Sequence, residues 1–336
     1  MTQAPRPIDE ERTPMNALLN ALAWSARRGS ILLAIGIFGG ILSPALAADF
    51  KFFITPNVLL MTTLVLLRVD IPAALGHLRR PARLAFIVAL QMLACPILAW
   101  LVIRPLQLDP GIEAGIVLLA TGCAAISSAA FARLVGLDPE LSLLTTLATL
   151  ALVSFTAPSI ALWLLGIDLA IGTTALMTRL LLVIGLPLLV SLLLRRLLGR
   201  DNLVRWGEAF DGALVWIVVF YGFAVMDGLA PRLAADPVWV AQALLAAFVA
   251  DYGLNLLTTG ILWRTGVRTA ATAGLMSGNR NMALYLAVLP ATTDPRITLF
   301  FGLCQIPLFL SPFLLKPLYR QLLSWAARPA GARWHR

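Results

Sequence analysis

Apolar runs of roughly 20 residues recur between about residue 30 and about residue 317. A run of that length is what a helix needs to cross the hydrocarbon core of a bilayer. Only 13% of the 336 residues are charged, against about 25% in soluble domains, and the mean hydropathy is +0.87. The sequence therefore predicts an all-α integral membrane protein that crosses the bilayer many times.

Ten transmembrane helices result when the apolar runs are divided at charged residues and at Pro or Gly. They divide the chain into an N-terminal tail (1–29), a first group of five helices (30–166), a second group of five (167–320) and a C-terminal tail (321–336). The predicted helices are 30–48, 55–76, 83–104, 111–135, 139–165, 173–194, 209–230, 237–263, 268–290 and 296–318.

Basic residues are unequally distributed between the two sides. Most of the 26 Lys and Arg residues lie in the termini and in alternate loops, a few lie in the remaining loops, and Arg280 lies inside a helix. The positive-inside rule then places both termini in the cytoplasm, for a protein of the plasma membrane or a bacterial inner membrane. The net charge of +9 therefore orients helices in the lipid bilayer, and we expect no nucleic acid partner. The oligomeric state is left open.

The N-terminal region admits two readings of its first helix. Residues 27–50 have the basic start, apolar core and small-residue end of a cleavable signal. A long tail with several acidic residues precedes them, so we expect the helix to be retained. In that tail, Met15, Leu18, Leu19 and Leu22 share one helical face. This favours a short helix on the membrane surface, with a disordered tail as the alternative.

Two segments of the chain are similar to each other: "GLDPELSLLTTLA" (136–148) and "TTDPRITLFFGLC" (292–304). Both read Asp-Pro, any residue, Leu/Ile, Ser/Thr, Leu. Asp138 and Asp294 are expected N-caps, each followed by a proline in the first helical position. The segments begin helices five and ten, and an offset of five helices inverts the second copy in the membrane. Inverted five-plus-five repeats are typical of secondary transporters.

The helices before these two segments each contain a polar or small-residue interruption. Helix four has "TGCAAISSAAF" (121–131) and helix nine has "LMSGNRNMA" (275–283). Interruptions at corresponding places predict discontinuous helices and a binding site near the bilayer midplane. Close helix packing through small residues is the alternative for the serines. The candidate binding residues are Ser127, Ser128, Asn279, Arg280 and Asn281.

Three stretches resemble the bile acid:sodium symporter family, a group of sodium/bile acid cotransporter-like proteins. They are residues 60–100, with "LMTTLVLLRVDIPAALGHL", residues 122–158, with "GCAAISSAAFARLVGLDPELSLLTTLA", and residues 277–290, "SGNRNMALYLAVLP". The resemblance implies ten helices, arranged as a four-helix panel and a six-helix core. It also implies that unwound helices four and nine cross beside two sodium sites and an organic-anion cavity.

The resemblance further implies a possible set of metal ligands for sodium. Ser128, Ser142 and Thr146 match hydroxyl ligands of the first site, and Gln91 matches a side-chain ligand of the second. Ser142 and Thr146 are four residues apart and so share one helical face. Hydroxyl oxygens suit a hard cation, by analogy with other oxygen-bound ions.

The chain also departs from the family pattern. The asparagine expected after Ser128 is Ala129, the glutamate shared by both sodium sites falls at about Met276, and a glutamine is replaced by Arg280. Asn281 matches. Without the carboxylate, and with a guanidinium group nearby, two Na⁺ ions would be poorly held. Sodium coupling is therefore in question.

Arg280 needs a physical explanation, because an unpaired charge at mid-membrane costs between ~3 and ~15 kcal/mol. Asp251 is the expected partner, and we expect the two side chains to pair directly or to share water. Both residues lie about 18 Å along their helices from the turn at 264–267, so their depths match. The alternative is that Asp251 lines a polar patch without touching Arg280.

Three roles for Arg280 remain open. In the first, which we favour, Arg280 replaces Na⁺ as a built-in cation. In the second, it binds an oxyanion of the substrate. In the third, it changes the proton affinity of Asp251, a carboxylate that would couple transport to protons. The coupling ion is then Na⁺, H⁺ or neither, and no other cofactor is expected.

The favoured function is a secondary active transporter, of the symporter type, for a small organic anion that moves by alternating access. An arsenite-efflux-like carrier is one alternative, because Cys123 lies in helix four. A non-transporting membrane sensor or channel is another. An enzyme is not expected, because the only histidines, His77 and His335, lie near the predicted cytoplasmic surface.

Overall fold

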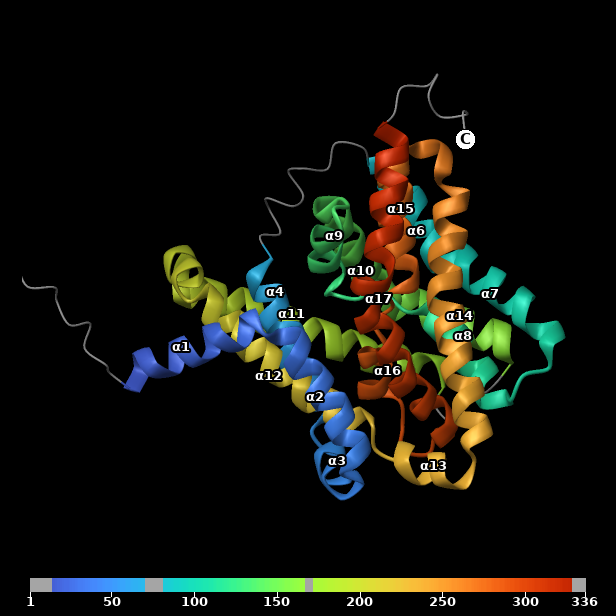
Figure 1. Cartoon of the computed structure of the whole chain (residues 1–336), viewed down its shortest axis with the longest axis horizontal. Coiled ribbons are helices and arrows are strands. Elements are labelled where there is room, and N and C mark those ends of the chain that lie inside the picture. The colour runs from blue at the N-terminus through green and yellow to red at the C-terminus, as the bar shows by residue number, and fades with distance from the viewer. Residues whose placement is uncertain (1–13, 70–80, 167–171, 328–336) are drawn as a thin grey trace, which may run out of the picture.

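The structure is a computed structural model, which describes residues 14–69, 81–166 and 172–327. Within these ranges the chain is helical except for short connections (Figure 1). The one extended pairing there is an antiparallel bridge between Ala124 and Arg280. His77 and His335 lie outside the described residues. The all-α prediction is confirmed.

Six of the described helical segments are long and apolar enough to cross a membrane, and a bent pair near the N-terminus makes up to seven. The multi-pass membrane prediction is therefore confirmed, whereas ten crossings are not. Two further apolar helices, Ile54–Arg68 and Pro110–Thr121, are shorter than a full span. The six segments are Pro81–Leu106, Pro139–Leu165, Thr173–Arg205, Gly207–Ala235, Pro237–Ile261 and Pro295–Ala326.

The element order follows the predicted runs closely. In chain order the elements are α1 (Pro14–Arg27), α2 (Gly29–Leu42), α3 (Pro44–Lys51), α4 (Ile54–Arg68), α6 (Pro81–Ala89), the π-helix η1 (Leu90–Ala94), α7 (Cys95–Ile103), η2 (Arg104–Leu106), α8 (Pro110–Thr121), α9 (Ser128–Val135), α10 (Pro139–Leu165), α11 (Thr173–Arg205), α12 (Gly207–Val225), α13 (Leu229–Ala235), α14 (Pro237–Ile261), η3 (Trp263–Thr265), α15 (Val267–Gly278), α16 (Met282–Val288) and α17 (Pro295–Ala327).

The first predicted helix, 30–48, is bent rather than straight. The helix axis bends by 107° between its two parts, α2 and α3, which are separated by Ser43. Pro44 begins α3 and lacks the amide that would continue the hydrogen-bond ladder of α2, so the chain turns there. Upstream, the residues from Pro14 are helical, and α1 packs along α12.

Four helices begin at an Asp-Pro pair, two more than the repeat predicted. Each aspartate accepts a hydrogen bond from a main-chain amide in the first turn. The proline that follows has no N–H, and nothing is lost because the first N–H of a helix has no partner within the helix. The caps are Asp109 (from Gly111 N, 2.9 Å), Asp138 (from Leu141 N, 3.0 Å), Asp236 (from Trp239 N, 3.0 Å) and Asp294 (from Arg296 N, 2.9 Å). The predicted caps at Asp138 and Asp294 are confirmed.

The helices form two groups that face each other (Figure 1). One group contains α2, α4, α11 and α12, which pack on one another, and the other contains α6 to α10 and α14 to α17. This division agrees with the expected four-helix panel and separate core. The inverted relation between the two halves of the chain stays a prediction.

Candidate ion and substrate site

Two helices of the core are broken at the predicted places. The chain leaves α8 at Gly122 and re-enters a helix, α9, at Ser128, and it leaves α15 at Gly278 and re-enters α16 at Met282. The two breaks pair with each other: Ala125 N donates to Asn279 O (2.8 Å) and Asn281 N donates to Cys123 O (2.9 Å). Two of the main-chain amides and two of the carbonyls freed by unwinding are thereby paired, as non-helical backbone at membrane depth requires.

The guanidinium group of Arg280 lies at this crossing and is 2% exposed. It donates three hydrogen bonds, all to main-chain carbonyls: Nη1 to Gly122 O (2.7 Å), Nε to Ser277 O (2.8 Å) and Nη2 to Gln91 O (3.0 Å). Gly122 and Ser277 stand at the C-terminal ends of α8 and α15, where the helix dipole is negative. The positive charge is therefore stabilised by two helix ends and a third carbonyl.

Local sequence and pairing explain why two of those carbonyls, Gln91 O and Ser277 O, have no helical partner. Within η1 the amide of Cys95 bonds to Leu90 O, one residue earlier than an α-helix would have it. The next amide along would serve Gln91 O, but residue 96 is proline and has no N–H. Ser277 O loses its usual helical partner for a different reason: the amide of Asn281, four residues later, donates to Cys123 O instead. Each carbonyl is left for the arginine.

The direct ion pair between Arg280 and Asp251 is not formed, so that part of the prediction was wrong, whereas a water shared by the two side chains stays a prediction. No ion pair among the described residues includes either of them. Asp251 lies on α14, is 3% exposed and has its Oδ2 atom without a hydrogen-bond partner. The main chain of Asp251 instead lies directly against Gly278. The arginine needs no carboxylate, because helix-end carbonyls take its N–H groups.

The sodium-ligand candidates share an unusual property. They are buried, and each has a polar side-chain atom without a hydrogen-bond partner, whereas buried polar groups in proteins are almost always paired. These atoms are Gln91 Oε1, Ser128 Oγ, Ser142 Oγ and Thr146 Oγ1. Unpaired hydroxyls at 0–3% exposure are what an oxygen-ligated guest or a bound water would satisfy.

Two sodium ions do not fit these residues. The side chains at the positions of the missing family ligands are apolar: Met276 is fully buried and Ala129 lines the cavity described below. The guanidinium group of Arg280 already places a positive charge at the carbonyls of the crossing. The unpaired hydroxyls of Ser128, Ser142 and Thr146 are neutral, and no carboxylate ion-pairs with Arg280 among the described residues.

The other candidate residues lie around the same crossing. Asn279 donates from Nδ2 to Ser311 Oγ on α17 (2.9 Å), which ties the second break to that helix. Asn281 is buried and its Nδ2 has no partner. Ser127 is the N-cap of α9 and lines the cavity. Cys123 is buried and free, and its carbonyl is used in the bridge.

A cavity of about 360 Å³ lies between the panel and this crossing. Its wall is mostly apolar, with polar groups from Arg280, Asn281, Ser127 and Thr146 on the core side. Arg68 and Asp211 also line it from the panel and form an ion pair there (3.0 Å), each about two-fifths exposed. Apolar walls with a few convergent polar groups are typical of small-molecule sites.

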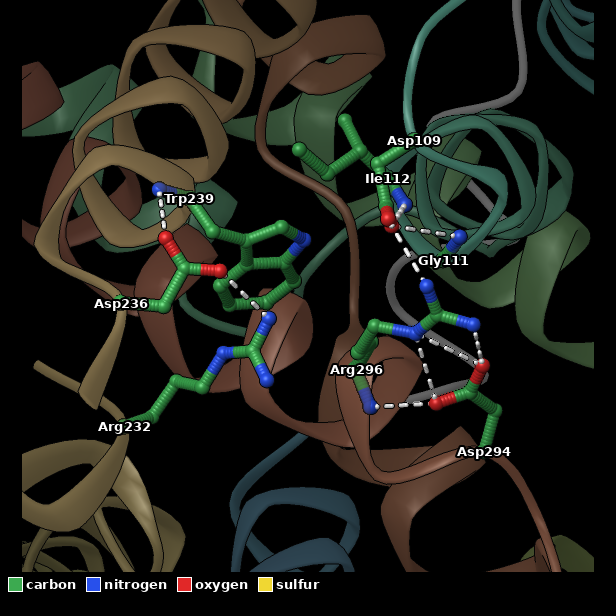
Figure 2. Close-up of polar contacts among 8 residues, drawn as sticks. All are labelled: Asp109, Gly111, Ile112, Arg232, Asp236, Trp239, Asp294 and Arg296. Carbon is green, nitrogen blue, oxygen red and sulfur yellow. Dashed lines mark hydrogen bonds and ion pairs between the residues drawn. The ribbon is translucent and has the colours of Figure 1, made fainter.

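A second polar cluster, which the sequence analysis missed, joins the starts of three core helices near α13 (Figure 2). Arg296 bonds Asp109 (2.8 Å) and Asp294 (2.7 Å), and so links the caps of α8 and α17. Arg232 bonds Asp236 (3.0 Å), the cap of α14. The few basic residues assigned to the predicted external side are thus largely paired: Lys51 also bonds Asp227 (2.9 Å) and Arg104 lies over the ring of Trp100.

We expect this cluster to make the stability of the protein depend on pH in the acid range. Hydrogen bonds from Arg296 lower the pKa of Asp294 below its ordinary value. Burial raises the pKa of Asp109, but the nearby indole of Trp239, the hydrogen bond from Gly111 N and the charge of Arg296 outweigh it and leave that pKa lowered. The indole Nε1 of Trp239 faces Asp109 with no partner of good geometry (Figure 2). A lowered folded-state pKa contributes stability above the unfolded value of about 3.9 that is lost as pH falls further.

We therefore expect acidification from about pH 6 to about pH 3 to lower the melting temperature, and Arg296→Gln to weaken that pH dependence. The groups are a quarter to a third exposed, so solvent screening limits the loss in Arg296→Gln at pH 6 to about 1 kcal/mol. Thermal unfolding of the purified protein at both pH values measures it. Arg104→Gln is the control, and an equal pH dependence in wild type and Arg296→Gln would contradict the assignment.

A polytopic helical protein in which two broken helices cross beside a cavity has the architecture of a secondary membrane transporter. The chain matches the model of the Sodium Bile acid symporter family over residues 55–226, slightly more than half of its length, and it belongs to that family. The resemblance noted in the sequence is thus confirmed. No curated protein gives a significant match to the chain.

Proposed function

We propose that this protein is a secondary active transporter for a small organic anion, which moves by alternating access and is not driven by two bound sodium ions. The observation that carries the proposal is the position of Arg280. Its guanidinium group binds the carbonyls of both broken helices, and its residue also lines the cavity. A tethered cation occupies the place where a mobile cation would otherwise bind.

Anion binding is supported by what faces the cavity. The first turn of α9 lines it, so the positive end of that helix dipole points toward a bound ligand. Arg68 supplies a second cation at the mouth, where its partner Asp211 leaves it partly exposed. The apolar remainder of the wall suits the hydrocarbon part of an organic anion.

Of the three roles open to Arg280, the built-in cation has the best support. Three of its five N–H groups are held by main-chain carbonyls, so the group serves the crossing first. An Arg bound in this way cannot dissociate, and it remains protonated at every physiological pH. The crossing then stays intact through the cycle without an ion from either side.

The thermal stability of the purified protein in NaCl, compared with equal KCl or choline chloride, tests this proposal. A sodium site with a Kd of about 5 mM would add ~2 kcal/mol in roughly 150 mM Na⁺, because the gain is RT ln(1 + [L]/Kd). We expect no such sodium-specific gain in the wild type. Detergent unfolding is commonly irreversible, so only the difference between the salts is used.

Arg280→Gln is the matched variant for this measurement, because an amide can ligate a cation and the competing charge is gone. A sodium-specific gain in wild type would overturn the built-in cation and return Ser128, Ser142, Thr146 and Gln91 to the role of sodium ligands. Counterflow of radiolabelled mono- and dicarboxylates in proteoliposomes tests transport itself. Absence of counterflow for every anion, with protein correctly inserted, would contradict the transporter proposal.

A further inference from the structure

Asp251 has a buried carboxyl group that takes no part in the hydrogen bonds of the crossing between the two broken helices. It lies in the middle of α14, where that helix packs closely on α15, and it is 3% exposed. Its Oδ2 atom has no hydrogen-bond partner, and no ion pair among the described residues reaches it. An ionised carboxylate in such surroundings is strongly disfavoured, because it has lost water and gained neither a counter-ion nor enough donors.

The groups around Asp251 are already bonded elsewhere. Asn255, one turn further along α14, donates its amide to Tyr319 Oη on α17 (2.7 Å). Asn279 donates its amide to Ser311 (2.9 Å), and Arg280 donates to carbonyls. In the structure these groups donate to acceptors other than Asp251. The Oδ2 atom of its carboxyl group is left without a hydrogen-bond partner.

Arg280 is the one cation that acts electrostatically on Asp251 among the described residues, and it forms no ion pair with it. The titratable groups that act on Asp251 electrostatically are Tyr252 on its own helix, Cys304 and Tyr319 on α17, and Arg280 at the break. The other charged residues on the elements packed against α14 form no ion pair with Asp251 among the described residues. They are Glu113 on α8, Arg232 on α13, Arg264 on η3, Arg268 on α15, and Arg296, Lys316 and Arg320 on α17.

A metal ion does not fit here. A hard cation needs several oxygen ligands that converge on one point. The other buried oxygen without a partner on this face of α14 is Thr259 Oγ1, which is eight residues away and therefore about 12 Å along the helix. No cluster of three or more His, Cys, Asp or Glu side chains suited to a metal occurs among the described residues. One free oxygen is sufficient for a proton.

We propose that Asp251 is a proton-binding site, and that its protonation and deprotonation couple the movement of the anion to that of H⁺. This rests on the proposed transporter function and adds the identity of the coupling ion. In the conformation described, Oδ2 holds the proton as a neutral carboxylic acid. The proton is returned to water when α14 and the break beside Gly278 separate, and no other bond is made or broken.

The site is placed where such a separation matters. The main-chain oxygen of Asp251 lies against Gly278, the last residue of α15 before the break. Asp251 is therefore next to the segment on which Asn279 and Arg280 are mounted. A movement of the crossing that hydrates the carboxyl group favours its charged form, and a movement that buries it favours the proton-bound form.

Infrared spectroscopy of the full chain in lipid nanodiscs reads this carboxyl group directly. A protonated carboxylic acid has a carbonyl stretching band that a carboxylate lacks. Across about pH 5 to about pH 9, a range in which buried carboxyls in general exchange protons, we expect a band that disappears with rising pH. It should be absent in Asp251→Asn and unchanged in Asp201→Asn, whose side chain is exposed on α11. Isotope labelling of aspartate in wild type identifies the band if Asp251→Asn does not fold.

Two results would overturn the proposal: no protonated aspartate at any pH, or an aspartate that stays protonated throughout, which would serve structure alone. The readout does not depend on transport. A titrating Asp251 in a protein without counterflow would refute the transporter proposal, whereas counterflow together with an Asp251 that does not titrate would refute proton coupling.

Discussion

Replacing Arg280 by methionine is expected to destabilise the protein by more than about 3 kcal/mol and to reduce anion uptake at least about tenfold. The substitution leaves the carbonyls of Gly122, Ser277 and Gln91 buried without donors, and bonds from charged donors are worth about 1.5–3 kcal/mol each. Thermal unfolding in detergent and uptake into proteoliposomes measure the two effects. Arg280→Lys should fall between, because an ammonium group keeps the charge and loses the planar fork.

Arg179→Met is the control for this substitution. Arg179 donates to one carbonyl, that of Val288 (2.9 Å), and its side chain is exposed, so its loss should cost less than about 1 kcal/mol. If Arg280→Met were as stable as Arg179→Met, the guanidinium group would not be what holds the two breaks together. The same result would remove the reason for which the built-in cation was proposed.

Gly278→Ala should be the second strongly damaging change, with a loss of about 3 kcal/mol. A Cβ atom there would lie 2.3 Å from the main-chain oxygen of Asp251, which a backbone atom cannot evade by rotation. Helices α14 and α15 must then separate, and overpacking of this kind costs about 1–3 kcal/mol or more. Because Gly278 precedes the break, uptake should fall as well. Thermal unfolding and uptake again provide the measurements.

Gly253→Ala on the neighbouring helix is the matched control. Nothing lies within 4 Å of a Cβ atom placed there. Alanine is a better helix former than glycine by up to about 1 kcal/mol, so this variant should be as stable as wild type or more stable. Equal melting temperatures for the two variants would mean that α14 and α15 are less closely packed at Gly278 than described.

The sequence predicted the helices well where an apolar run had clear ends. Helix α10 matches the predicted range 139–165 residue for residue, because Asp138 and Pro139 begin it and Gly166, in a left-handed conformation, ends it. The single predicted helix at 30–48 is instead two helices, because Pro44 cannot donate the hydrogen bond that would continue the first. The end predicted near residue 318 was too early, because three prolines are accommodated within α17, which continues to Ala327.

The sequence predicted the location of the candidate site more accurately than the contacts within it. Paired interruptions located both breaks, and the breaks bond to each other as broken helices at one site do. The direct ion pair of Arg280 with Asp251 was predicted wrongly, because a charged side chain in the sequence suggests an oppositely charged side chain as its partner, whereas the structure provides main-chain carbonyls. Every residue has a main-chain carbonyl, so the residue types do not show which carbonyls are free to accept a hydrogen bond. The pattern Gln91 to Pro96, which frees one of them, is visible only when the missing N–H of proline is considered together with a π-helix.

The burial of all three cysteines has a practical consequence. Cys95, Cys123 and Cys304 are the only thiols in the chain, and none is at the surface. Wild-type protein is therefore a ready background for single-cysteine labelling with reagents that do not cross membranes. A thiol introduced beside Arg264 and another beside Asp294 would report on the two ends of the molecule separately, and their reactivity in intact cells would assign each end to its side of the bilayer.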